Sequence, residues 1–449
     1  MAKRLIVNAR IVNEDSIREV DLLIHNGRID KIAGSIEGQA GWETFDVQGK
    51  HILPGMIDDQ VHFRQPGATQ KGDIASESAA AVAGGITSFM DMPNVNPPTL
   101  NGERLEEKYR MAADNARANY GFYLGASNEN IRDIESLAPN QACGVKVFMG
   151  ASTGNLLVDD PEALNAVFAR SPVPIVTHCE DTPTILANER HYRNVYGENV
   201  PMEMHPHIRS ADACYMSSSL AVDLASQHRA RLHVLHLTTA RELTLFSNAP
   251  LAQKRITAEV CVHHLFFDDS DYASKGTLIK CNPAIKTDVD KQALLRAVLE
   301  NRIDVIATDH APHTWEEKQQ PYFSAPAGLP LVQHALPSLL QQYHLGRLTL
   351  PTIVEKTSHA PARVFGVMER GFIREGYWAD LAVVDLHAPF TVTKSNILYK
   401  CGWSPFEGYT FHSSIVATFV NGRLAYLNGK VAPGVHGQRL QFDNYEDRR

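Results

Sequence analysis

The sequence of 449 residues lacks the features that mark secreted, membrane-spanning and nucleic-acid-binding proteins. No stretch supplies the roughly 20 consecutive apolar residues of a membrane-spanning helix, and the uncharged segment 78–90 is short and rich in alanine and glycine. The N-terminal residues turn polar at Asn8 and contain no secretory signal. The formal net charge of −8 argues against nucleic acid or an anionic membrane as the main partner. We therefore expect a cytoplasmic protein that acts on a small molecule.

The six cysteines have no Cys-x-x-Cys spacing, and several stand inside apolar runs, as Cys261 does. This pattern indicates buried reduced thiols rather than a disulfide framework. The glycine pairs, such as Gly84-Gly85, do not form a phosphate-binding loop and are expected to serve turns and packing. With 44% hydrophobic and 21% charged residues the composition is that of an ordinary globular protein. The length suffices for a large barrel with an accessory domain.

Through the middle of the chain, short β-branched runs alternate with helical segments, for example 162–170, 211–228 and 290–301. This alternation is typical of a parallel α/β sheet. Eight strands are expected, with ends near His62, Met92, Ala126, Met149, His178, His236, His263 and Asp309. Eight strands favour a closed TIM-type (β/α)8 barrel over an open doubly wound sheet.

Both ends of the chain are rich in short strands, and Asn-Gly hairpin signals stand at 26–27 and 421–422. We predict one small β-sandwich domain assembled from residues 1–52 and 375–449, flanking the barrel over 53–374. Two separate β modules are the less economical alternative.

Polar side chains stand in or at the ends of the expected strands, and barrel enzymes carry their catalytic groups at the C-terminal strand ends. They are His62, Lys146, His178, His236 and Asp309. Taken singly, each has an ordinary explanation, such as a structural histidine or a helix N-cap. Their convergence on one mouth of a barrel indicates a metal centre instead.

Lys146 needs a chemical account, because a protonated ammonium does not bind a cation. An apolar strand favours the neutral amine by desolvation, and a neutral amine reacts with carbon dioxide to give a carbamate. The two carbamate oxygens would bridge two metal ions about 3.5–4 Å apart, which would activate a water molecule near neutral pH. Asp309 would accept the proton of that water and return it to the departing group.

With these residues, the sequence resembles the dihydroorotases of the amidohydrolase superfamily over nearly its whole length. The matching motifs are LPGMID at 53–58, MPN at 92–94, GVKVF at 144–148, THCE at 177–180, HLTT at 236–239, NP at 282–283, TDHAPH at 308–313 and ADLAV at 379–383. The resemblance implies the reversible closure of N-carbamoyl-L-aspartate to L-dihydroorotate in pyrimidine synthesis. It also implies one or two zinc ions on His62, N6-carboxylated Lys146, His178, His236 and Asp309, with Asp309 as the catalytic acid and base.

The resemblance assigns substrate contacts to His62, Arg64, Asn94, Asn282, His313 and the backbone of Ala327 and Gly328. Arg64 is the most informative, because it follows His62 by two positions and is expected on the same strand face. Its guanidinium could hold the substrate carboxylate through two hydrogen bonds. Allantoinases and hydantoinases resemble the chain elsewhere, but their substrates lack this carboxylate and they usually lack the arginine–asparagine pair.

Two positions depart from the family pattern: Gln60 replaces the first histidine of a His-x-His pair, and Gln65 replaces a usual glutamate. Because an amide oxygen is a weaker zinc ligand than imidazole, the first metal would be loosely held, absent or completed by water. Two alternatives stay open: an allantoinase- or dihydropyrimidinase-type cyclic amidase, and an inactive dihydroorotase-like partner of another pyrimidine-pathway enzyme. A homo-oligomer is also open.

Five other histidines are assigned to structure or solvent. His205 and His207 are expected in a loop, His263 and His264 at the end of the seventh strand, and His334 in a helix.

Overall fold

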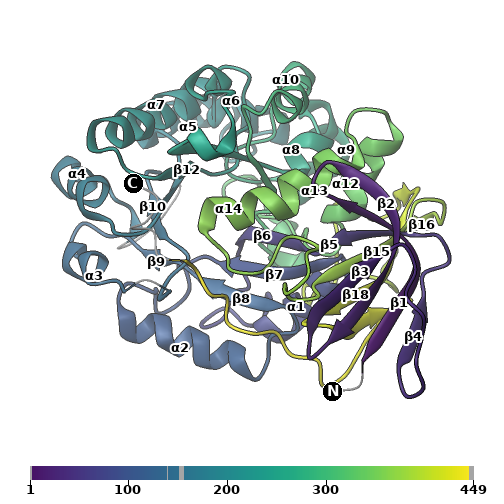
Figure 1. The fold of residues 1–449 in the computed structure, drawn as a ribbon. Coiled ribbons are helices and arrows are strands. Elements are labelled where there is room, and N and C mark those ends of the chain that lie inside the picture. The colour runs from purple at the N-terminus through teal and green to yellow at the C-terminus, as the bar shows by residue number, and fades with distance from the viewer. Residues whose placement is uncertain (1–2, 139, 151–155, 444–449) are drawn as a thin grey trace.

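The computed structural model describes residues 3–138, 140–150 and 156–443. Two sheet systems lie side by side, one made from both ends of the chain and one from its middle (Figure 1).

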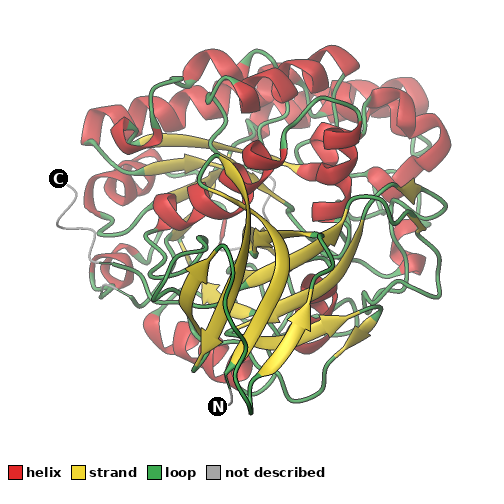
Figure 2. Cartoon of the chain, turned by 45° about the vertical axis from the view of Figure 1, so that its right-hand side comes forward, coloured by secondary structure: helices red, strands yellow, loops and turns green. Residues whose placement is uncertain are grey.

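The first system is a nine-stranded sheet that faces the viewer in Figure 2. Its strands are β1 (Arg4–Asn13), β2 (Ser16–His25), β3 (Arg28–Ala33), β4 (Glu43–Asp46), β5 (His51–Pro54), β15 (Leu381–Asp385), β18 (Ser414–Val420), β19 (Arg423–Leu427) and β20 (Lys430–Val431). The order is β20-β19-β18-β15-β5-β1-β2-β3, with β4 paired to β1. The two chain ends join where β15 runs antiparallel to β5. A mostly β unit built from both ends is therefore present, while the boundaries at 52 and 375 stay predictions.

The second system consists of short parallel strands. They are β6 (Met56–Val61), β7 (Ile86–Asp91), β8 (Asn119–Phe122), β9 (Leu124–Gly125), β10 (Val145–Phe148), β11 (Ile175–His178), β12 (Leu232–Val234), β13 (Ile256–Cys261) and β14 (Val305–Ala307). They form a sheet β6-β7-β8 and a sheet β14-β13-β12-β11-β10-β9. The two sheets adjoin at both edges, because only Tyr123 separates β8 from β9 and Val61 forms a parallel bridge with His310. Nearly every residue of these strands is buried, which explains their continuous apolar runs.

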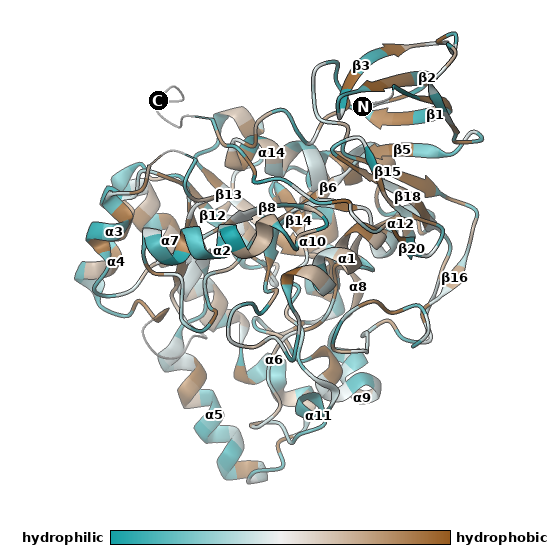
Figure 3. Ribbon diagram, turned by 90° about the horizontal axis from the view of Figure 1, so that it is seen from below, coloured by the Kyte–Doolittle hydropathy of each residue, from teal (hydrophilic) through white to brown (hydrophobic). Residues whose placement is uncertain are grey.

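Helices cover the outside of the parallel strands (Figures 1 and 3), and α5 reaches away from the body as a mainly hydrophilic ribbon. They are α1 (Ile74–Ala83), α2 (Gly102–Ala113), α3 (Ile131–Glu135), α4 (Pro161–Arg170), α5 (Thr182–Tyr196), α6 (His205–Ile208), α7 (Ala211–His228), α8 (Val262–Phe266), α9 (Tyr272–Lys275), α10 (Asp288–Leu299), α11 (Trp315–Lys318), α12 (Ala335–His344), α13 (Leu350–Val354) and α14 (Ala360–Phe365). In the described part of the chain, none of them has the length and apolar character needed to cross a membrane.

The end of the described chain leaves the nine-stranded sheet and runs along β8. The backbone N–H of Tyr120 donates to the Gln438 carbonyl at 3.0 Å, and the N–H of Leu440 donates to the Tyr120 carbonyl at 2.9 Å. The predicted range 375–449 of the β-domain thus contains a segment that packs on the parallel strands.

Candidate active site

The predicted metal ligands come together in two pairs at the C-terminal ends of the parallel strands. His62 Nε2 lies 3.0 Å from Asp309 Oδ1, and His178 Nδ1 lies 2.8 Å from His236 Nε2. Lys146 lies on β10, next to β11, and its side chain is among the largest that are fully buried. Burial lowers the pKa of Lys146 to about 8, although the nearby Asp309 carboxylate opposes the shift. The lowered pKa increases the neutral fraction of the amine, which is the form that carbamate formation requires.

The histidine pair has its tautomers set by an acidic neighbour. His178 Nε2 lies 2.8 Å from Glu180 Oε2, so the ring donates there and its Nδ1 lone pair faces His236. Burial favours the neutral form of Glu180, but Arg209 and His178 outweigh it and hold the pKa of this carboxyl at about 2. Burial lowers the pKa of both histidines, so both rings are neutral near pH 7. A carboxylate that orients a ligand histidine is a common feature of metal sites.

These residues fit a divalent metal. Nδ1 of His236 is buried and has no hydrogen-bond partner in the described part of the chain. Two neutral imidazoles, a neutralised lysine and a carboxylate together form a donor set for zinc or a similar ion. Glu180 is not among the residues predicted from the sequence, although its position two residues after His178 in the THCE motif is a signal for this role.

The first pair is held by amides. Asn94 Oδ1 lies 2.8 Å from His62 Nδ1, which directs the other ring nitrogen of His62 to Asp309. Gln60 donates from Nε2 to Asp309 Oδ1 at 3.1 Å. Burial alone would raise the pKa of Asp309, but the His62 contact and other cationic neighbours hold it below its usual value. Gln60 thus directs its N–H2 group at the carboxylate and its oxygen elsewhere.

Arg64 lies beside the first pair, but its placement differs from the prediction. Strand β6 ends at Val61, and Arg64 follows in a turn with φ of +66°, so strand alternation does not place it. Its Nε donates to the Pro312 carbonyl at 3.0 Å, and Nη2 lies 3.1 Å from His313 Nε2. The guanidinium therefore contacts the predicted substrate residue His313 from the segment after β6, and not from the strand itself.

The other predicted substrate residues lie on neighbouring loops. Asn282 Oδ1 is buried without a hydrogen-bond partner among the described residues, and the Ala327 carbonyl lies 3.0 Å from His313 Nε2. Gly328 has φ of +140°, and a Cβ there would stand 2.4 Å from the Ala311 carbonyl oxygen, so only glycine fits. The N–H of Gly328 donates to the Lys280 carbonyl. Of the two predicted backbone contacts to substrate, only that of Ala327 is therefore retained.

The structure also places Gln65 and the five histidines that were assigned to structure or solvent. Gln65 Oε1 accepts from the N–H of Ile74 at the start of α1. His205 and His207 lie in helix α6, so the prediction of a loop is wrong; Pro206 at the first turn favours that helix. His263 and His264 lie in α8, directly after β13, and His334 is the N-cap of α12.

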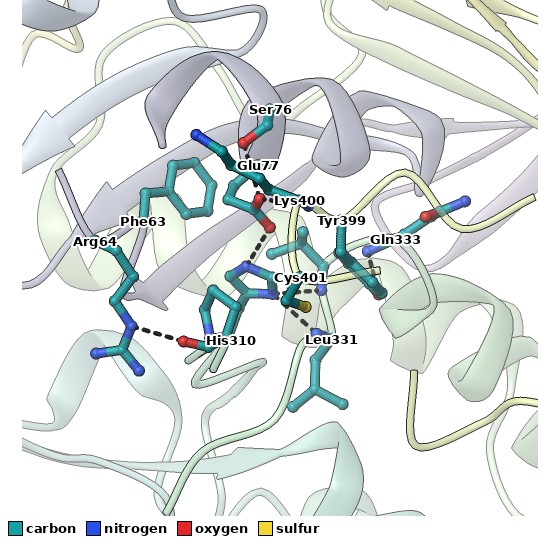
Figure 4. A network of polar contacts seen from close by, with 12 residues as sticks. Phe63, Arg64, Ser76, Glu77, His310, Leu331, Gln333, Tyr399, Lys400 and Cys401 are labelled. Atoms are coloured by element: carbon teal, nitrogen blue, oxygen red, sulfur yellow. Dashed lines mark hydrogen bonds and ion pairs between the residues drawn. The ribbon is translucent and has the colours of Figure 1, made fainter. Parts of the chain in front are cut away.

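Buried hydrogen bonds from residues that were not predicted as site residues hold the loop after β14 in place (Figure 4). His310 Nε2 lies 2.9 Å from Glu77 Oε2 on α1, and His310 Nδ1 accepts from the N–H of Leu331 at 2.9 Å. The second Glu77 oxygen accepts from the N–H of Lys400. Because His310 is next to Asp309, this buried network positions the loop that carries the candidate catalytic carboxylate.

Two further groups of metal-ligating side chains occur among the described residues. One is Cys261, His263 and His264, and the other is Asp59, His233 and Glu259. In each group the ligand atoms lie within 4.8 Å of one another and every side chain is buried. Neither group contains a predicted ligand.

Comparison with known proteins identifies the family. Residues 51–425 match the model of the amidohydrolase family. A dihydroorotase from Methanothermobacter thermautotrophicus is 31% identical over 92% of this chain and 93% of its own length. An allantoinase from Desulfitobacterium hafniense is 29% identical over 97% of both chains.

Among solved structures, the L-hydantoinase (dihydropyrimidinase) from Arthrobacter aurescens superposes with a TM-score of 0.93 at 26% identity, covering 98% of this chain and 100% of that one. The predicted resemblance to dihydroorotases is confirmed by these relatives. The chain belongs to the amidohydrolase family.

Proposed function

We propose that this chain is a dihydroorotase, which closes N-carbamoyl-L-aspartate to L-dihydroorotate and reopens the ring. The observation that carries the proposal is the Arg64 guanidinium beside His313, next to the His62–Asp309 pair. Full-length dihydroorotase relatives at 31–33% identity support the same activity. In this proposal the two parallel sheets form one closed TIM-type barrel, and the sheet from both ends is one side of a β-sandwich.

The proposed metal centre uses His62, Lys146, His178, His236 and Asp309 as ligands for one or two zinc ions, with Lys146 carboxylated on its side-chain nitrogen. The buried, unpaired Nδ1 of His236 and the lowered pKa of Lys146 support this assignment. A divalent metal bound there supplies Lewis-acid activation of water and of the amide carbonyl.

The protein's own groups bind and orient the substrate and move one proton. Asp309 takes the proton from the attacking water during hydrolysis and returns it to the ring nitrogen that leaves. Arg64 binds the carboxylate that becomes the 6-carboxylate of the ring, with Asn94, Asn282, His313 and the Ala327 backbone orienting the rest. The desolvated position of Arg64 strengthens a charge-assisted hydrogen bond.

The second candidate is an allantoinase- or hydantoinase-type cyclic amidase, favoured by the allantoinase and hydantoinase relatives. These substrates carry no carboxylate for Arg64. An inactive assembly partner would not need the paired imidazoles or a buried lysine with a lowered pKa. The cytoplasmic location and a homo-oligomer or enzyme partner stay predictions.

The deciding experiment assays the purified full chain with N-carbamoyl-L-aspartate, L-dihydroorotate, allantoin and dihydrouracil, together with metal analysis. Turnover of the first two substrates at least 100-fold above the others is expected. Preferred turnover of allantoin or dihydrouracil would support the second candidate, and no turnover by metal-loaded protein would support the inactive partner.

A further inference from the structure

A group of three metal-ligating side chains lies beside the candidate active site, where β13 ends and α8 begins. Its members are Cys261, His263 and His264. All three side chains are buried, and their ligand atoms lie within 4.8 Å of one another. The two histidines were expected to serve structure or to face solvent. Both are buried, and three of their four ring nitrogens have no well-formed hydrogen bond among the described residues.

Three of the four imidazole nitrogens in this group have no well-formed hydrogen bond among the described residues, although His263 lies near the Thr308 backbone. Neither ring nitrogen of His263, which is 1% exposed, makes a well-formed hydrogen bond within the described chain, and Nδ1 of His264 is equally unpaired. His264 Nε2 donates to the Pro283 carbonyl at 3.2 Å, which leaves the lone pair on Nδ1. A backbone carbonyl that fixes the tautomer in this way is typical of a ligand histidine.

The charges around Cys261 favour a cation. Its thiol is placed to donate to Glu259 Oε1 at 3.5 Å or to Gln60 Oε1 at 3.7 Å. Burial raises the pKa of this thiol, and the neighbouring carboxyl groups of Glu259 and Asp309 raise it further. The carboxylate of Asp309, whose pKa is held below its usual value, attracts a metal ion, which on binding displaces the thiol proton to solvent.

We propose that Cys261, His263 and His264 form a zinc site additional to the proposed catalytic centre. One thiolate and two neutral imidazoles are ligands that zinc prefers. Ligand atoms at 2.0–2.3 Å from a tetrahedral zinc are about 3.3–3.8 Å apart, so small side-chain rotations close the group around the ion. One bond forms from each ligand atom to zinc, and one proton leaves the thiol.

Gln60 is placed to supply the fourth ligand of this site. Its Oε1 is 3.7 Å from Cys261 Sγ, a separation that two ligands of one zinc ion have. Its Nε2 donates to Asp309 at the same time. The amide thus joins the two centres, which gives glutamine at position 60 a role that a second catalytic histidine would not have. The site goes beyond the proposed function and does not depend on the substrate.

Metal content and cobalt spectroscopy of the full chain test the proposal. Zinc-loaded wild-type protein should hold one more zinc per chain than Cys261→Ser or His263→Gln. After cobalt replacement, the wild type should show sulfur-to-cobalt charge-transfer absorption, and Cys261→Ser should lose it. Cys214→Ser is the matched control, since Cys214 is a buried thiol on α7 whose Sγ contacts Thr238 Oγ1; it should behave as the wild type.

Cys281 is the competing thiol, because its Sγ lies 3.8 Å from His264 Nε2. Cobalt absorption that persists in Cys261→Ser and disappears in Cys281→Ser would overturn the assignment, as would equal zinc content in wild type and Cys261→Ser. If the variants do not fold, zinc-edge X-ray absorption on the wild type decides: one sulfur ligand supports the site, and a shell of nitrogen and oxygen alone excludes it.

Discussion

At Asp309 the backbone itself helps to aim the carboxylate. Asp309 has φ of +51°, and two other predicted site residues, Arg64 and His236, have φ of +66° and +40°. Non-glycine residues rarely adopt this left-handed region, and such strain gathers where a side chain must point in one direction. His62 and Gln60 then hold Oδ1 from two sides.

We expect Asp309→Asn to keep the fold and to lose turnover. Asparagine tolerates the left-handed backbone better than most residues, so the turn persists while the proton acceptor is removed. Loss of general acid–base catalysis should lower kcat by about 10²–10⁴. The measurement is kcat for dihydroorotate hydrolysis, with circular dichroism as the control for folding. Activity within a few-fold of the wild type would exclude Asp309 from proton transfer.

Arg64 should determine specificity. In Arg64→Met, KM for dihydroorotate should rise about 10- to 100-fold, because a hydrogen-bonded ion pair contributes roughly 1.5–3 kcal/mol. Slow hydrolysis of dihydrouracil, which has no carboxylate, should change little. Lys71→Met is the matched control, since Lys71 Nζ lies 3.1 Å from His313 Nδ1 on the other side of the same ring. Equal losses on both substrates would mean that Arg64 supports the loop instead of the carboxylate.

At the scale of elements, helix α1 and the loop after β14 act together through Glu77 and His310. The two side chains are 233 positions apart in sequence and fully buried. In Glu77→Gln the amide accepts one hydrogen bond fewer and leaves a buried donor or acceptor unpaired. Such a defect costs about 1–3 kcal/mol, so we expect a lower melting temperature and, because His310 adjoins Asp309, a lower kcat with little change in KM.

Ser76→Ala is the control for this prediction, since Ser76 Oγ donates to Glu77 Oε1 at 2.9 Å, whereas His310 contacts the other oxygen, Oε2. It should lower the melting temperature less than Glu77→Gln and leave kcat near that of the wild type. Equal kcat in Glu77→Gln and wild type would show that the network stabilises the fold without positioning the loop.

The elements themselves were largely predictable, because apolar runs and helical periodicity are local signals. Helix α7 has the predicted bounds 211–228, and α10 begins two residues earlier than predicted because Thr287 caps it. The predicted strand ends at His178 and near Asp309 agree with the ends of β11 and β14, because the apolar runs stop there. Arg64 lies in a left-handed turn that strand alternation does not describe. The Glu77–His310 contact joins distant segments, and no periodicity in either segment encodes it.

At the scale of the whole molecule, a buried charged group links the two parallel sheets. Asp59 comes from β6, whereas His233 and Glu259 come from β12 and β13 of the other sheet. His233 Nε2 lies 3.3 Å from Asp59 Oδ2 and 3.6 Å from Glu259 Oε2, and none of the three is exposed by more than 1%. These contacts link the two sheets as long as the His233 ring is protonated.

This group should make stability depend on pH. Burial alone would lower the pKa of His233, but Asp59 and Glu259 outweigh it and raise the value to about 9. Since the folded pKa lies above the unfolded value of about 6.5, the stabilisation is complete below pH 6.5 and is lost as pH rises through 9. Burial and Asp59 also raise the pKa of Glu259, which acts in the same direction.

We therefore expect the unfolding free energy of the wild type to fall between pH 6.5 and 9 by roughly 1 kcal/mol per pH unit for each proton released. His233→Gln should be less stable at pH 6.5, and its deficit should shrink towards pH 9. Urea unfolding at several pH values, at constant zinc, measures both. His205→Gln is the control: burial lowers the pKa of His205, so this ring is neutral in both states above pH 7 and its deficit should not vary with pH. Parallel pH profiles for wild type and His233→Gln would show that His233 is neutral in the folded protein, and the two sheets would then be held by packing alone.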